Sequence, residues 1–126
     1  MVVLDASALL ALTFGERGSD AVAAAIGGGA AMSTVNLAEA VARVVHVGQD
    51  GEAIARVWRR GPIDWVDFDA NLATLSGLIL PLTRHRGLSL GDRACLALAK
   101  QLRCPAVTAD RAWLDVDVGV EIQLVR

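Results

Sequence analysis

The first residues of the chain constrain its fold most, because a short apolar run leads directly into a carboxylate. Residues 1–4 are all apolar, and Asp5 follows them at once, before a run that favours helix. A short apolar run with two adjacent valines is typical of a strand buried in a parallel sheet. Asp5 is therefore predicted at the carboxyl end of a strand, the edge of an open α/β sheet where ligands bind.

Short apolar strands alternate with helices along the rest of the chain. Further strands are predicted at residues 30–35, 63–68, 105–108 and 121–125, and the mixed alternation of the second of these indicates an edge strand. Helices are predicted at residues 8–14, 19–26, 37–47, 51–60, 70–86 and 90–102. This alternation predicts a three-layer α/β/α sandwich with a central, mainly parallel sheet.

Polar residues mark the expected starts of several helices. Ser19 or Asp20, Asn36 and Ser89 stand where a side-chain oxygen can accept a hydrogen bond from the first turn. Pro81 lies inside the longest predicted helix and is expected to kink it.

Length and composition predict one domain over residues 1–126, large enough to bury a core. The apolar fraction of 54% suits a sheet covered on both faces. The chain has no apolar run long enough for a membrane span and no basic segment of a secretory signal at its start, so a cytoplasmic protein is expected. Cys95 and Cys104 lack metal-binding spacing and are expected to be free thiols.

The charge balance is consistent with a nucleic-acid partner only if some acids bind a metal. The chain has 14 acidic and 12 basic residues, a net charge of −2. If four acids belong to a metal site, 10 remain against 12 bases, and the rest of the surface carries +2. Lys100 is the only lysine among the bases, and arginine suits bidentate phosphate contacts. An Ala- and Arg-rich proteome explains the same composition equally well.

Four carboxylates recur at strand ends or near helix starts, and each has a local explanation. Asp5 and Asp110 follow apolar strands and are suitable helix N-caps. Glu39 and Asp92 each follow a capping residue at the spacing of a capping box. If all four converge at one sheet edge, their repulsion raises their pKa values, unless a cation is bound there. Mg²⁺ and Mn²⁺ prefer such oxygen ligands, so a carboxylate metal site is predicted.

A hydrated metal ion held by carboxylates suits phosphodiester hydrolysis, because it activates water and neutralises charge at the phosphorus. Ser7 and Thr108 flank two of the acids and are candidates to orient a ligand or a water, or simply to stabilise local turns. Asp115 is a possible accessory acid. Four arginines near the later acids are candidates for RNA phosphate contacts, or for a solvated helix face: Arg84, Arg86, Arg93 and Arg111.

Four segments together resemble the PIN-domain family, and within it the VapC-type toxins of toxin–antitoxin pairs. The segments are residues 3–9, 33–39, 88–99 and 107–113, in this order along nearly the whole chain. The resemblance implies a parallel α/β/α sandwich and a Mg²⁺- or Mn²⁺-dependent endoribonuclease that cleaves structured RNA. By position, it makes Asp5, Glu39, Asp92 and Asp110 the catalytic acids and metal ligands. It also implies a homodimer that is silenced by a cognate antitoxin protein.

Two other classes of protein fit the sequence less well. A PIN fold that binds RNA or a partner without cleavage would have no need of the full set of acids. A phosphatase with an aspartyl nucleophile would require a second acid at the position of Ser7. The metal-dependent ribonuclease is therefore the leading hypothesis, and the non-cleaving binding module is the alternative.

Overall fold

Five parallel strands form the central sheet of the computed structural model, which describes residues 1–126. The strands are β1 (Val2–Leu4), β2 (Ala30–Ser33), β3 (Ile63–Val66), β4 (Ala106–Thr108) and β5 (Ile122–Leu124). Their order across the sheet is β3-β2-β1-β4-β5, and every neighbouring pair is parallel. All five predicted strands are present, and β3 lies at an edge as its sequence pattern indicated.

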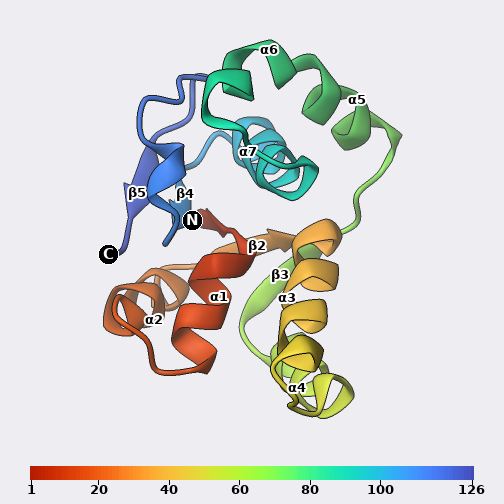
Figure 1. The fold of residues 1–126 in the computed structure, drawn as a ribbon, viewed down its shortest axis with the longest axis vertical. Helices are drawn as coiled ribbons and strands as arrows, with labels where there is room; N and C mark the ends of the chain where they lie inside the picture. The colour runs from red at the N-terminus through yellow and green to blue at the C-terminus, as the bar shows by residue number, and fades with distance from the viewer.

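Helices cover both faces of this sheet, so the predicted three-layer sandwich is confirmed (Figure 1). One layer contains α1 (Ala6–Thr13), α2 (Ser19–Gly27), α3 (Thr34–His46) and α4 (Gly51–Arg60). The other contains α5 (Ala70–Leu78), α6 (Leu80–Thr83), the 3₁₀ turn η1 (Arg84–Arg86) and α7 (Leu90–Leu102). A second 3₁₀ turn, η2 (Arg111–Trp113), follows β4.

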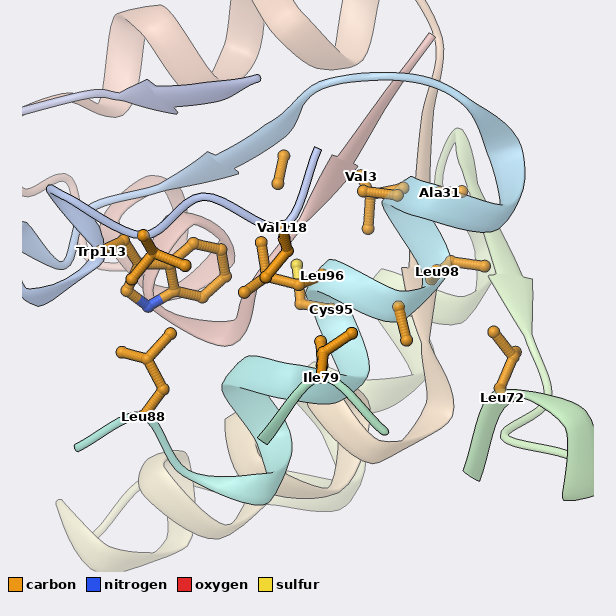
Figure 2. Packing of buried hydrophobic residues seen from close by; sticks show 14 residues of the cluster. Val3, Ala31, Leu72, Ile79, Leu88, Cys95, Leu96, Leu98, Trp113 and Val118 are labelled. Carbon is orange, nitrogen blue, oxygen red and sulfur yellow. The ribbon is translucent and has the colours of Figure 1, made fainter. Parts of the chain in front are cut away.

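Alternate residues of the strands supply two separate hydrophobic cores. Val3 of β1 packs into the core beneath α5 and α7, where Trp113 is fully buried (Figure 2). Leu4, the next residue, packs on the opposite face among α1 to α4. This is the period of two expected of a strand buried on both faces.

The connections on either side of β1 place the candidate site. From β1 the chain crosses to β2 through α1 and α2, whereas it reaches β4 from β3 through the other helical layer. The direction of winding therefore changes between β1 and β4. A crevice opens at the carboxyl ends of strands at such a switch point, and this is where open α/β sheets bind ligands.

Two predicted helix caps are wrong. Neither Ser19 nor Asp20 caps α2, because the chain enters that helix through Gly18, whose φ is 97°. A Cβ on Gly18 would lie 2.6 Å from the carbonyl oxygen of Val125, so this close approach requires glycine. Asn36 does not cap α3 either, since Ser33 accepts the capping hydrogen bond from the Val35 amide and the helix begins three residues earlier than predicted.

The long helix predicted over residues 70–86 is also wrong. It is divided into α5, α6 and η1, with the first break at Ile79. Pro81 occupies the first turn of α6, where its missing N–H leaves no hydrogen bond unmade. Proline therefore starts a new helix here and does not kink a continuous one.

Both cysteines are free, with Cys95 fully buried on α7 and Cys104 partly buried after it. None of the helices has the length and apolar character needed to cross a membrane.

Candidate active site

Asp5 is the buried centre of the site. It follows β1 directly, caps α1, and is only 3% exposed. Its Oδ1 accepts hydrogen bonds from the Ala8 amide at 2.8 Å and the Ser7 hydroxyl at 2.7 Å. Its Oδ2 accepts from the Thr108 hydroxyl at 2.6 Å and again from Ser7 at 2.9 Å. The N-cap explanation for Asp5 is therefore correct, but it accounts for only one of these four donor contacts.

Burial raises the pKa of Asp5 from 3.8 to about 6, even though three groups donate hydrogen bonds to it. The donors from Thr108, Ala8 and Ser7 lower this pKa, and the nearby carboxylate of Asp92 raises it. Desolvation is the largest of these effects. A carboxylate in this setting is stabilised by any cation that reaches it.

Ser7 and Thr108 join the ends of the two central strands. The Ser7 Oγ lies 3.2 Å from the Thr108 Oγ1 and accepts from the Ala109 amide at 2.9 Å. Thr108 Oγ1 also accepts from the Asp110 amide at 3.0 Å. These contacts go beyond the local turns that the sequence allowed, because they span about a hundred residues of chain and fix Asp5 between them.

Glu39 reaches the site from the second turn of α3, one turn later than expected, because that helix begins at Thr34. It is thus not part of a capping box. The Asn36 side-chain amide donates to Glu39 Oε2 over 3.4 Å. Partial burial raises the pKa of Glu39, the Asn36 hydrogen bond lowers it, and the charge of Asp92 raises it again.

Asn36 and Gly91 determine how closely α3 and α7 approach, and neither was singled out from the sequence as a site residue. Asn36 is fully buried and its amide donates to the Gly91 carbonyl at 3.0 Å. The Glu39 carboxylate lies directly over Gly91, where a Cβ would overlap Glu39 Oε1 and Cδ. The one available signal was a glycine immediately before Asp92 in the first turn of a predicted helix.

Asp92 lies beside these groups and completes the predicted capping box. Its Oδ2 accepts from the Ser89 amide at 2.9 Å, while the Ser89 hydroxyl accepts from the Asp92 amide at 3.2 Å. Oδ1 of Asp92 has no hydrogen-bond partner within the chain. The charge of Asp92 raises the pKa of both Asp5 and Glu39, so the three carboxylates interact.

The buried thiol of Cys95 lies near the same three acids. Burial raises its pKa well above the usual value, and the charges of Asp5, Asp92 and Glu39 each raise it further. Asp5 after β1, Glu39 of α3 and Asp92 of α7 therefore all lie near the Cys95 side chain.

Asp110 lies at the rim of the same sheet edge. It caps η2 by accepting from the Ala112 amide at 2.9 Å through Oδ1, and it is exposed. Its backbone is tied to Asp5 through the Thr108 hydroxyl, which contacts both residues. Asp110 therefore shares the edge with Asp5, but its charge is not among those that raise the pKa of Asp5 or Glu39.

The donor set fits a hard divalent cation in its chemistry, although the side chains are not gathered as metal ligands. The structure has no group of three or more His, Cys, Asp or Glu side chains arranged to hold a metal ion. Asp92 and Asp110 instead direct one oxygen each to their own helix caps. The buried Oδ1 of Asn36 has no hydrogen-bond partner, which leaves an unpaired oxygen beside Glu39. Carboxylate and amide oxygens are the ligands that Mg²⁺ and Mn²⁺ prefer.

The candidate phosphate-binding arginines mostly hold the protein's own backbone. Arg86 donates to the carbonyls of Ala112 at 3.1 Å and Leu114 at 2.9 Å, and so anchors η2. Arg93 donates to the Ser76 carbonyl, and Arg111 donates to the carbonyl of Arg126. Arg84 is exposed on η1 with no hydrogen bond or ion pair within the chain.

Asp115, the candidate accessory acid, follows η2 in the left-handed region, at a φ of 69°. The His85 ring nitrogen Nε2 lies 3.1 Å from its backbone oxygen. Its side chain is exposed and makes no hydrogen bond with the residues around Asp5.

Family comparison agrees with this architecture. The family model of the PIN domain matches residues 2–119, nearly the whole chain, and the chain therefore belongs to the PIN domain family. No protein of curated function matches the chain by sequence.

Solved structures share the fold at low sequence identity. A toxin–antitoxin complex from Klebsiella pneumoniae is 16% identical, with 100% of this chain and 98% of that chain covered and a TM-score of 0.72. The sarcin–ricin-loop-cleaving toxin VapC20 from Mycobacterium tuberculosis is 16% identical, with 88% and 91% covered and a TM-score of 0.74. VapBC2 from Rickettsia felis, bound to a promoter DNA fragment, is 15% identical, with both chains fully covered and a TM-score of 0.74. Identities of this size show a shared fold, and function has to be argued from the site.

Proposed function

We propose that this PIN domain is the toxin of a VapC-type toxin–antitoxin pair, a metal-dependent endoribonuclease that cleaves structured RNA in the cytoplasm. The observation that carries the proposal is Asp5, which is buried at the switch point of the sheet and interacts with Asp92. Burial raises the pKa of Asp5 even though it is hydrogen-bonded, and ionisation of such a buried carboxyl is unfavourable for folding. Its presence at the ligand-binding edge is therefore explained best by a function.

Asp5, Glu39, Asp92 and Asp110 are the residues that would hold Mg²⁺ or Mn²⁺. When bound, such an ion lowers the pKa of a coordinated water and neutralises charge on the phosphoryl group. The chain's own residues do the positioning: Ser7 and Thr108 hold both Asp5 oxygens, and Asn36 holds Glu39 against Gly91. We assign Ser7 and Thr108 as positioning residues. Asp115 makes no contact with this group, so the structure gives no support to a role for it as an accessory acid.

The proposed partners are structured RNA, a cognate antitoxin and a second copy of the chain. Support comes from the fold shared with a toxin–antitoxin complex and with a toxin described as cleaving an RNA loop. Exposed apolar side chains offer surfaces for protein partners, among them Val57 of α4 and Leu78 of α5, each 70% exposed.

The alternative is a PIN domain that binds RNA or a partner without cleaving. It is favoured by one observation: Asp92 and Asp110 both direct an oxygen to a helix cap, and no acid cluster is assembled for a metal. The nuclease is favoured by the closeness of three acids, since the charge of Asp92 raises the pKa of both Asp5 and Glu39.

The test is cleavage of purified total RNA by the wild type and by Asp5→Asn, each with Mg²⁺ and with EDTA. Discrete fragments that require both Asp5 and the metal are expected, and their ends would identify the target. Asp64→Asn is the matched control, because Asp64 is an exposed acid in the middle of β3, away from the carboxyl ends of the strands. Absence of cleavage by a folded, inhibitor-free wild type would favour the binding module.

A further inference from the structure

A cavity of about 550 Å³ opens between α1 and α3, next to the acids. Its volume lies within the roughly 300–1,000 Å³ of small-molecule sites in proteins. The residues that matter for its chemistry come from α1, from α3 and from the loop that follows α3: Ser7, Leu10, Phe14, Arg43, Val47 and Gln49.

The cavity and the acid site share a wall. Ser7 lines the cavity and donates to Asp5 Oδ1 at 2.7 Å, so Asp5 lies directly behind this part of the cavity wall. Ser7, Leu10 and Phe14 have the spacing of one face of α1. Arg43 follows Glu39 on α3 by four residues, so it lies one turn beyond that acid on the same face. The cavity therefore leads away from the acids between two helix faces.

The lining combines apolar surface with an unpaired cation. Leu10 is partly buried, whereas Phe14 and Val47 are 40% and 45% exposed. Arg43 is exposed and makes no hydrogen bond or ion pair within the chain. The cavity's other guanidinium, Arg126, is paired with Glu16 at 3.4 Å. The lining thus carries two positive charges and one negative charge, and its one free charge is positive.

We propose that this cavity is a nucleotide subsite, which holds the nucleotide adjacent to the bond that is cleaved. The base stacks on Phe14 against Leu10 and Val47, and its edge hydrogen-bonds to Gln49. Arg43 binds the neighbouring phosphate. A flat aromatic base attached to an anionic phosphate matches an aromatic face beside a free guanidinium, a combination by which single-stranded nucleic acids are held. This subsite deepens the ribonuclease proposal and rests on it.

The test measures binding separately from cleavage. Fluorescence anisotropy of a labelled single-stranded oligouridylate and of a labelled oligoadenylate is measured in EDTA, with Arg43→Ala and Phe14→Ala compared with the wild type. Arg43→Ala is expected to weaken binding about tenfold and to reduce the slope of log affinity against log salt by about 0.7, the value for one phosphate of a single strand. Phe14→Ala is expected to weaken binding about tenfold without changing that slope, because it removes stacking and no charge.

Two matched controls accompany these variants. Arg56→Ala removes an exposed, unpaired arginine from α4, outside the cavity, and Leu78→Ala removes an exposed apolar side chain from α5. Both are expected to bind RNA as the wild type does. If Arg43→Ala and Phe14→Ala bind the oligonucleotides with the same affinity as the wild type, the subsite proposal is wrong. Binding of a protein partner would then be the remaining explanation for the cavity.

The cleavage assay distinguishes failure of the subsite from failure of the ribonuclease proposal. Metal-dependent cleavage that Arg43→Ala and Phe14→Ala leave unchanged would refute the subsite and retain the nuclease. RNA binding that depends on both residues, without cleavage under any condition, would retain the subsite on a non-cleaving module.

Discussion

Gly91→Ala should separate stability from activity, because the added methyl group meets only the end of a flexible side chain. The new Cβ would overlap Glu39 Oε1 and Cδ and lie 2.7 Å from Oε2. No backbone atom is among these neighbours, so Glu39 can rotate away while α7 stays in place. The hydrogen bond from Asn36 to the Gly91 carbonyl is unaffected, since it involves main chain at that position.

The expected change in stability is small. Alanine in place of a helical glycine stabilises a helix by up to about 1 kcal/mol. Loss of the hydrogen bond from Asn36 to Glu39 costs about 0.5–1.5 kcal/mol, and its 3.4 Å length places it at the low end of that range. The free energy of unfolding should therefore remain within about 1 kcal/mol of the wild type. Under the proposed function Glu39 helps to hold the metal, so its displacement by an ångström or more should lower the rate of cleavage about 100-fold.

Urea unfolding and the rate of Mg²⁺-dependent RNA cleavage, measured on the same preparations, test this separation. Gly77→Ala is the matched control, because Gly77 is in α5 and a Cβ there has no atom within 4 Å. It should be as stable as the wild type or slightly more so, with unchanged cleavage. Full cleavage by Gly91→Ala would refute the role given to Glu39, and a loss of several kcal/mol would refute the argument that only a side-chain end is displaced.

Three further variants test the buried network and the fold. The free energy of unfolding of Asp5→Asn at pH 7 should exceed that of the wild type by about 3 kcal/mol. The reason is that the pKa of Asp5 is raised from 3.8 to about 6, and its ionisation destabilises the fold by about 1.36 kcal/mol per pKa unit. In the wild type, the stability contributed by protonated Asp5 is fully present below pH 3.8 and is lost as the pH rises through 6. Urea unfolding of both proteins at pH 4 and pH 7 checks the direction of this effect. A variant less stable than the wild type at pH 7 would contradict the prediction. Thr108→Val removes the hydroxyl that donates to Asp5 Oδ2, so the pKa of Asp5 should rise further and the pH profile of cleavage should shift upward. The free energy of unfolding at pH 7 should fall by about 1–3 kcal/mol. An unchanged pH profile would argue against a positioning role for Thr108. Gly18→Ala should lower the melting temperature, because its Cβ would lie 2.6 Å from the Val125 carbonyl at a φ that L residues rarely adopt, and an unchanged temperature would show that the loop can move.

The fold could be predicted from the sequence because its strands are short, apolar and separated by helices. Val3 and Leu4 pack into opposite hydrophobic cores, so both faces of the strand are apolar and its sequence is a continuous apolar run. The local roles of Asp92 and Asp110 were also predictable, since Asp92 belongs to a capping box with Ser89 and Asp110 is itself a helix cap, and the structure retains both.

The start of α3 could not be predicted because two local preferences conflict there. Thr34 and Val35 are β-branched and favour a longer strand, which leaves Asn36 as the apparent cap. Ser33 caps the helix instead, and Asn36 is buried against α7. That contact joins residues 55 positions apart, so no local pattern could indicate it. The support of Glu39 by Asn36 and Gly91 therefore emerges only in three dimensions.

Binding of Mn²⁺ to the metal-free protein, followed by electron paramagnetic resonance, tests most directly whether these carboxylates form one metal site. We expect the wild type and Asp64→Asn to bind the ion equally well. Asp5→Asn and Asp92→Asn should each bind at least about tenfold more weakly, the equivalent of about 1.4 kcal/mol. Equal binding by the wild type and both site variants would contradict the account, because the ion would then be held elsewhere.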